Sequence, residues 1–153
     1  MLCNGTDFSV ELPEGSIDSS SYLFVLPIES SMTPNVLITK RLSKEPLSAA
    51  QAMQDYIVSQ RRSLEDIEIS DQIEGGGSDR DYALFIGQWC AGELAMRQKT
   101  IFLHFAAAAT QVFSIALTSL AEDFDAAEPQ FDQIVRNFKH QPNPQHAPVS
   151  DAG

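Results

Sequence analysis

The sequence predicts an α+β fold, in which an antiparallel sheet of about six to seven strands packs against two helices. Short apolar segments bounded by Pro and Gly predict the strands. Two other segments repeat their apolar residues at helical spacing and predict the helices. The expected order is three strands, a helix, four strands and a final helix. A chain of 153 residues is long enough for one domain with its own core.

The first three strands are expected at residues 8–12, 22–26 and 35–41. Residues 8–12 alternate apolar and polar side chains and end at Pro13, whereas residues 22–26 are apolar throughout and end at Pro27. The third segment begins after Pro34. Sharp stops of this kind are typical of strands that end in turns.

The first helix is expected at residues 49–64. Ser48 and Gln51 have the spacing of a capping box, in which each side chain bonds the backbone amide of the other residue. Met53, Ile57 and Leu64 follow at helical spacing. They predict one buried stripe on this helix.

The remaining strands are expected at residues 66–73, 82–90, 93–105 and 111–120. Ile67, Ile69 and Ile73 should share one side of the first of these strands, and residues 74–81 should form a flexible turn. Residues 91–92 should turn a hairpin. Pro129 suits the first turn of the closing helix, whose apolar stripe comprises Phe131, Ile134, Val135 and Phe138.

The charge of the chain disfavours several classes of partner. Ten Lys and Arg stand against 21 Asp and Glu, which gives a net charge of −11. Such a field repels phosphate backbones and anionic lipid headgroups, so we expect neither nucleic-acid binding nor direct membrane anchoring. The first residues show no signal-peptide pattern, and the two cysteines make no disulfide framework. We therefore expect a cytoplasmic protein.

One domain is expected from residue 8 to residue 138. Residues 1–7 should be a loose N-terminus. Residues 139–153, which are rich in Pro, Ala, Ser and Gln, should be a flexible tail.

The most informative pattern is a sheet with two apolar faces. Strands with one face in water alternate, but residues 22–26, 36–38 and 82–86 are apolar at every position. Two interpretations remain open on this pattern. In one, the two helices and the loop at residues 29–34 divide the cover between both faces. In the other, part of one face stays open as an apolar groove for a partner.

No segment predicts catalysis, a metal or a cofactor, and we expect a protein that is not an enzyme. Cys90 lies at the expected hairpin turn, about 11 residues from His104, which is too far for proton transfer along a strand. The glycine run at residues 75–77 has no following Lys-Ser/Thr. The acidic residues 122–125 suit the start of a helix rather than a calcium loop.

The chain resembles the DcrB-like branch of the PsbP/Mog-type fold, and within it the Eag (effector-associated) chaperones of bacterial type VI secretion. The matching segments span most of the domain: residues 8–15, 22–27, 34–41, 48–64, 97–102 and 131–138. Ser16 departs from the aromatic residue that is common after the Pro-Glu-Gly of relatives, and the turn around residues 75–81 is long.

The resemblance implies a homodimeric adaptor-chaperone that shields the N-terminal transmembrane helices of a membrane-spanning effector and helps to load it for export. It implies that one sheet face and the first helix form the binding groove. The predicted groove residues are Leu23, Val25, Leu37, Met53, Ile57 and Gln98. Gln98 is expected either to hydrogen-bond polar groups of a bound helix or to face solvent. The alternative function is a PsbP/Mog-like binding module that recognises a soluble partner.

Overall fold

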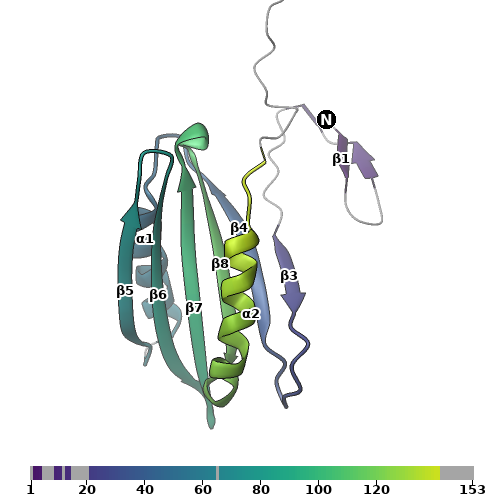
Figure 1. The fold of residues 1–153 in the computed structure, drawn as a ribbon, viewed down its shortest axis with the longest axis vertical. Helices are drawn as coiled ribbons and strands as arrows, with labels where there is room; N and C mark the ends of the chain where they lie inside the picture. The colour runs from purple at the N-terminus through teal and green to yellow at the C-terminus, as the bar shows by residue number, and fades with distance from the viewer. Residues whose placement is uncertain (1, 5–8, 12, 15–20, 65, 142–153) are drawn as a thin grey trace, which may run out of the picture.

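A computed structural model describes residues 2–4, 9–11, 13–14, 21–64 and 66–141 (Figure 1). The strands are β1 (Leu2–Asn4), β2 (Ser9–Glu11), β3 (Tyr22–Val25), β4 (Asn35–Leu42), β5 (Glu68–Gly76), β6 (Arg80–Ala91), β7 (Leu94–Phe105) and β8 (Gln111–Leu120). The helices are α1 (Ala49–Ser63) and α2 (Phe124–Asn137), with short 3₁₀ turns at Ala106–Ala108 and Ala121–Asp123.

Six strands form the main sheet in the order β3-β4-β8-β7-β6-β5. Every neighbouring pair is antiparallel. Most neighbours are also successive in the chain, because short turns join them. The pairing of β4 with β8 brings the two halves of the chain together. The predicted α+β class with an antiparallel sheet and two helices is confirmed.

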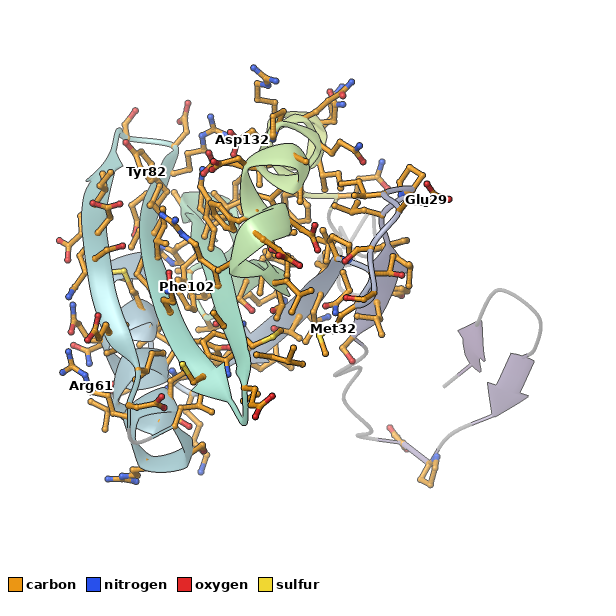
Figure 2. All side chains as sticks on the ribbon, turned by 90° about the horizontal axis from the view of Figure 1, so that it is seen from below. Glu29, Met32, Arg61, Tyr82, Phe102 and Asp132 are labelled. Carbon is orange, nitrogen blue, oxygen red and sulfur yellow. The ribbon has the colours of Figure 1, made fainter. Side chains whose placement is uncertain are left out.

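The two helices lie on opposite faces of the sheet (Figure 1, Figure 2). The cluster under α2 contains Phe124 and Phe131, which pack against Ile115 and Leu117 of β8. The cluster under α1 contains side chains from the other face of the same sheet. It comprises Ala49, Ala52, Met53, Ile57, Ala83, Phe85, Phe102 and Val112. Both faces of the sheet are therefore apolar mainly because each face packs against one helix.

Helix α1 begins where the sequence predicts, with half of the predicted capping box. The Ser48 Oγ accepts the backbone N–H of Gln51 at 3.1 Å, but the Gln51 amide donates to Asp55 instead of returning to Ser48. A second cap comes from the sheet, because Asp81 on β6 accepts the Ala49 N–H at 2.8 Å. A negative charge near the N-terminus of a helix is stabilising. The sheet thus fixes the position of this helix.

Helix α2 begins earlier than predicted. It starts at Phe124, so Pro129 lies inside the helix and not in its first turn. The preceding 3₁₀ turn carries Glu122 and Asp123, and Asp125 follows in the first turn. Acidic side chains suit that end. The buried Phe124 and Ala127 extend the apolar stripe upstream of the proline, and their packing decides the start of the helix.

Strand β5 is longer than predicted and contains an irregularity. It reaches Gly76, so residues 74–76, expected in a turn, pair with β6. The register shifts between Ile69 and Asp71. An extra residue in one strand moves all later side chains to the other face. Ile69 and Ile73 therefore lie on opposite faces, and the prediction that they share one side is wrong.

Both ends of the domain differ in detail from the prediction. Strand β2 does not join the main sheet but pairs with β1, which falls in the segment predicted to be loose. The predicted tail is described only to Gln141, and residues 142–153 lie outside the described residues. Within its first residues His140 stacks on Phe105, with ring centroids 5.1 Å apart.

The contrast between buried and exposed phenylalanines gives a stability prediction. Phe85 is fully buried, whereas Phe24 on β3 is 49% exposed. Phe85→Ala should lower the free energy of unfolding by about 3–5 kcal/mol through loss of contacts and a residual cavity. Phe24→Ala should lower it by only about 1 kcal/mol. Urea denaturation followed by circular dichroism measures both, and equal losses would contradict the assignment of Phe24 to a surface.

Candidate functional site

The part of the sheet that α1 leaves open lies over β3, β4 and β8. The register pairs Leu23 with Leu37, and Leu37 with Ala116, so all three side chains are on the α1 side of the sheet. Leu23 is 63%, Val25 65% and Leu37 37% exposed. The three strand residues predicted for the groove wall thus form one exposed apolar patch on the face that carries α1.

A groove separates α1 from this half of the sheet. Its volume is about 260 Å³, with Asp55 and Tyr56 of α1 on one side and Thr39 of β4 on the other. Its floor includes Phe102 and Val112. Thr39 is two residues from Leu37 on the same strand, so the groove continues into the exposed patch. We call the groove and the patch together the α1-side groove.

An ion pair bridges the two sides of the α1-side groove. The Arg41 guanidinium of β4 lies 3.0 Å from the Asp55 carboxylate of α1. Both side chains are more than two-fifths exposed, so their interaction adds little to stability. Both side chains line the groove, so a ligand bound there would lie beside this pair.

The sheet face beside the groove, next to β8, carries polar side chains, and we call this region the polar floor. Gln98 is 8% exposed, and its amide donates to the Thr118 hydroxyl at 3.2 Å. The Gln98 Oε1 and the Thr100 Oγ1 are buried and have no hydrogen-bond partner among the described residues. An unsatisfied buried acceptor costs about 1–3 kcal/mol. Both residues are buried beside the groove and are not among its lining residues, so a bound molecule would reach these two atoms only after a local movement of the side chains above them.

Tyr56 connects the apolar core to this polar floor. Its ring packs against Phe85 and Phe102, with centroids 5.8 and 5.6 Å away. Burial raises the pKa of the Tyr56 hydroxyl, and the nearby Gln98 amide partly offsets that rise. The hydroxyl stays neutral at physiological pH and is a hydrogen-bond donor at the groove.

Two of the predicted groove residues lie elsewhere. Met53 and Ile57 are 0% and 2% exposed and face the sheet in the core beneath α1. They hold the helix in place and do not line an open surface. Helical spacing identifies an apolar stripe but does not tell a stripe that faces the core from one that faces a groove.

Sequence reasoning missed three features of the site. Tyr56 follows Met53 at i+3 and Thr100 follows Gln98 at i+2, so their spacing places them beside predicted residues. The Arg41–Asp55 pair joins a strand to a helix. No local pattern in the sequence indicates that contact.

A partly buried histidine ties the start of α1 to the sheet. His104 Nδ1 lies 2.6 Å from Asp81, the carboxylate that also caps α1, and His104 Nε2 lies 2.9 Å from the Ala109 carbonyl oxygen. Burial lowers the pKa of His104, but the hydrogen bonds to Asp81 and Ala109 outweigh it, so the pKa is raised. The protonated imidazole donates to both oxygens.

Within the described residues no cluster of His, Cys, Asp or Glu has the geometry of a metal site. Cys90 is exposed at the end of β6, where the register places it opposite Ala95 and far from His104. No helix in the described part of the chain is long and apolar enough to cross a membrane.

Comparisons with known proteins support the fold. No family model matches the sequence, and no curated protein sequence matches it. The structure is similar to the crystal structure of the protein of unknown function PA94 from Pseudomonas aeruginosa, with a TM-score of 0.74, 17% identity, and coverage of 94% of this chain and 98% of that one. It is also similar to the solution structure of cyanobacterial PsbP (CyanoP) from Synechocystis sp. PCC 6803. That match has a TM-score of 0.53 and 9% identity over 86% of this chain and 98% of that one. The chain therefore has a PsbP-like fold.

The His104 environment predicts a pH dependence of stability. A histidine whose pKa is raised by folding contributes stability that is complete below its unfolded pKa of about 6.5 and is lost as pH rises through the folded value. The free energy of unfolding should therefore fall as the pH rises above about 6.5 and through the folded pKa of His104. Urea denaturation across this range should show the fall in the wild type, and His104→Gln should flatten it. A wild type and variant with parallel pH profiles would contradict the assignment.

Proposed function

We propose that this protein is a cytoplasmic adaptor-chaperone that binds and shields the transmembrane helices of a type VI secretion effector before export. The observation that carries the proposal is the α1-side groove, which combines exposed Leu23, Val25 and Leu37 with a polar floor. The resemblance to Eag chaperones supplies the class of client. A PsbP-like fold alone does not specify one.

The exposed patch suits an apolar helix. A transmembrane helix of about 20 apolar residues aggregates in water unless its side chains are covered. Burial of apolar surface contributes about 25 cal/mol per Å². Leu23, Val25 and Leu37 are uncharged, aliphatic and adjacent, so they bury such a surface without leaving a charge unpaired.

The polar floor suits the small polar residues that transmembrane helices carry. Ser and Thr side chains in such helices form hydrogen bonds across helix interfaces. Beside the groove, the Gln98 Oε1 and Thr100 Oγ1 are buried acceptors without partners among the described residues, and a bound helix would reach them after a local movement of the groove lining. Hydroxyl donors of a bound helix would satisfy them. Gln98 would then discriminate between a helix with polar spots and a uniformly apolar one.

The remaining features of the proposal follow from the same class of client. The protein would act without a cofactor or catalysis, as a homodimer in the cytoplasm. Its charge of −11 keeps it off anionic membrane surfaces while it holds a membrane segment. Release of the client would occur on contact with the export machinery.

The groove wall can be tested by charge substitution. Leu37→Asp places a carboxylate on the patch and should weaken client binding at least about tenfold, because burying an unpaired charge is unfavourable. Ile73→Asp is the matched control, since Ile73 is 50% exposed on β5 at the other edge of the sheet. The client is first identified by mass spectrometry of proteins that co-purify with the tagged chain from its native cytosol. Binding is then measured with the purified pair.

Three outcomes separate the proposal from its alternative. A stoichiometric client with long apolar helices that Leu37→Asp releases and Ile73→Asp retains supports the chaperone. A client without apolar helices indicates a binding module for a soluble partner. A helix-bearing client that binds Leu37→Asp normally removes the groove from the proposal.

The role of the buried amide is tested separately. Gln98→Leu removes an unsatisfied acceptor but also the hydrogen bond to Thr118, so the free energy of unfolding should change by less than about 1 kcal/mol. Affinity for a client helix that contains Ser or Thr should fall about tenfold, because one buried hydrogen bond is lost. Isothermal titration with the client helix and with a Ser/Thr→Ala version measures the loss. If Gln98→Leu weakens both versions equally, the amide does not bind those hydroxyls.

A further inference from the structure

Strand β3 forms one outer edge of the main sheet and is apolar on both faces. Tyr22, Leu23, Phe24 and Val25 are 54%, 63%, 49% and 65% exposed. Leu23 and Val25 face the α1 side of the sheet, and Tyr22 and Phe24 face the α2 side. A helix bound on the α1 side therefore covers only two of these four side chains. The other two need a different explanation.

The backbone of β3 presents hydrogen-bonding groups away from the sheet. The Leu26 N–H donates to the Pro34 carbonyl oxygen at 2.9 Å, and the register continues from this pair without a shift. In an antiparallel pair, hydrogen-bonded residues alternate with residues whose groups point the other way. Phe24 and Tyr22 thus bond to β4, whereas the N–H and C=O groups of Leu23 and Val25 point outward.

The opposite edge of the sheet is protected by charges and a register shift, whereas this edge has only its short length and the nearby Pro27. Strand β5 carries Glu68, Asp71 and Glu74 and has a register shift between Ile69 and Asp71. Charges and bulges are the usual features that prevent an edge from pairing with another strand. Strand β3 has neither in its four residues. The difference indicates that pairing is prevented at one edge and permitted at the other.

A second groove adjoins β3 on the α2 side. It has a volume of about 670 Å³ and lies between Phe24, Leu26 and Ile38 of the strand region and Ile134 and Phe138 of the α2 region. Figure 1 shows α2 running beside β3 at this face. The amides of Gln130, Gln133 and Asn137 line its helix side, and Lys139 is the single charged side chain among its lining residues.

We propose that the β3 edge binds an extended segment of a partner polypeptide as an added, seventh strand of the sheet. Only an extended polypeptide supplies N–H and C=O groups at the spacing of the outward groups of Leu23 and Val25. Its alternate side chains lie beside Leu23 and Val25 on one face and beside Tyr22 and Phe24 on the other. An added strand therefore covers all four exposed residues at once and closes the open side of the groove between β3 and α2.

Charge favours a different polypeptide over a second copy of this chain. Each copy carries −11, so this edge attracts a basic segment more than a second copy, and the homodimer proposed above is expected to form through another surface. The edge itself carries no charge, so a segment with apolar residues at its centre and Lys or Arg at its ends meets an uncharged strand within an attractive field. The partner is thus expected to present such a segment outside its own folded core.

This inference goes beyond the chaperone proposal and uses different groups. The α1-side groove acts through side chains on one face, whereas the added strand acts through the backbone of β3 and the α2 face. Leu37→Asp should affect client-helix binding alone. Phe24→Ser should affect strand addition alone, because Phe24 is on the α2 side. The two proposals can therefore fail independently.

The test uses a defined peptide and proline substitutions in the full chain. The probe is fluorescein-labelled Lys-Thr-Val-Thr-Val-Thr-Val-Lys with blocked ends, and the control peptide has proline at its third and fifth positions. Val25→Pro removes one outward N–H and leaves the β4 ladder intact, because Pro is tolerated at a sheet edge. Val25→Ala removes a similar part of the side chain and keeps the N–H. Leu23→Pro and Leu23→Ala are a second pair in case the first fails to fold.

Fluorescence anisotropy should show saturable binding of the probe and none of the control peptide. Each proline variant should bind about tenfold more weakly than its alanine partner, which corresponds to one lost hydrogen bond. Equal affinities within both pairs, or no saturable binding by the wild type, would overturn the proposal. So would sedimentation that shows a wild-type dimer dissociated by Val25→Pro, since the edge would then belong to a second copy.

Discussion

The structure depends on one geometric constraint, which is that a six-stranded sheet is wider than a single helix. Six strands about 4.8 Å apart extend about 24 Å from the first to the last, and a helix with its side chains covers about 10–12 Å. Each face here carries one helix, so about half of each face has no helix above it. On the β5 side of the sheet the uncovered positions are mostly polar. On the β3 side they are Leu23, Val25 and Leu37 on one face and Tyr22 and Phe24 on the other. The binding surfaces proposed above are therefore the parts of an apolar sheet that the helices do not cover.

The groove can keep its shape because polar contacts fix both helices to the sheet. Asp81 caps α1 and bonds His104, so the first turn of the helix is tied to β6 and β7. On the other face the Lys99 amine lies 3.1 Å from Glu128 and 2.9 Å from Asp132 of α2. Burial lowers the pKa of this amine, but the two carboxylates raise it by more, so the net shift is upward. Arg97 lies over the Phe124 ring, 4.5 Å from its centroid. A preformed surface spends less of its binding free energy on ordering, which suits the proposed role of holding a client without chemical energy.

The sequence was sufficient for features that depend on local patterns. Apolar runs located β3, β4, β6, β7 and β8, the Ser48 cap located α1, and alternation placed Leu23, Val25 and Leu37 on one face. It was insufficient where tertiary contacts decide. The register shift after Ile69, the start of α2 ahead of Pro129 and the pairing of β2 with β1 follow from packing and pairing that no local pattern specifies. Met53 and Ile57 were assigned to the groove because a helical stripe shows that residues are buried but not against what. Gln98 was located correctly on its strand, but its unsatisfied oxygen is visible only with its neighbours in place.

The two proposed surfaces share β3, and this sharing links them energetically. Leu23 and Val25 belong to the α1-side groove, while their backbone groups form the outward edge. A strand added to that edge would stand beside both side chains and become a wall of the groove. Binding at either surface would then change the affinity of the other by the same factor. If one partner carried both an apolar helix and a neighbouring extended segment, the second contact would form within a complex already made, at an effective concentration set by the linker. Moderate affinity at each surface would then be enough for a long-lived complex, and competition for either surface would be enough to start its release.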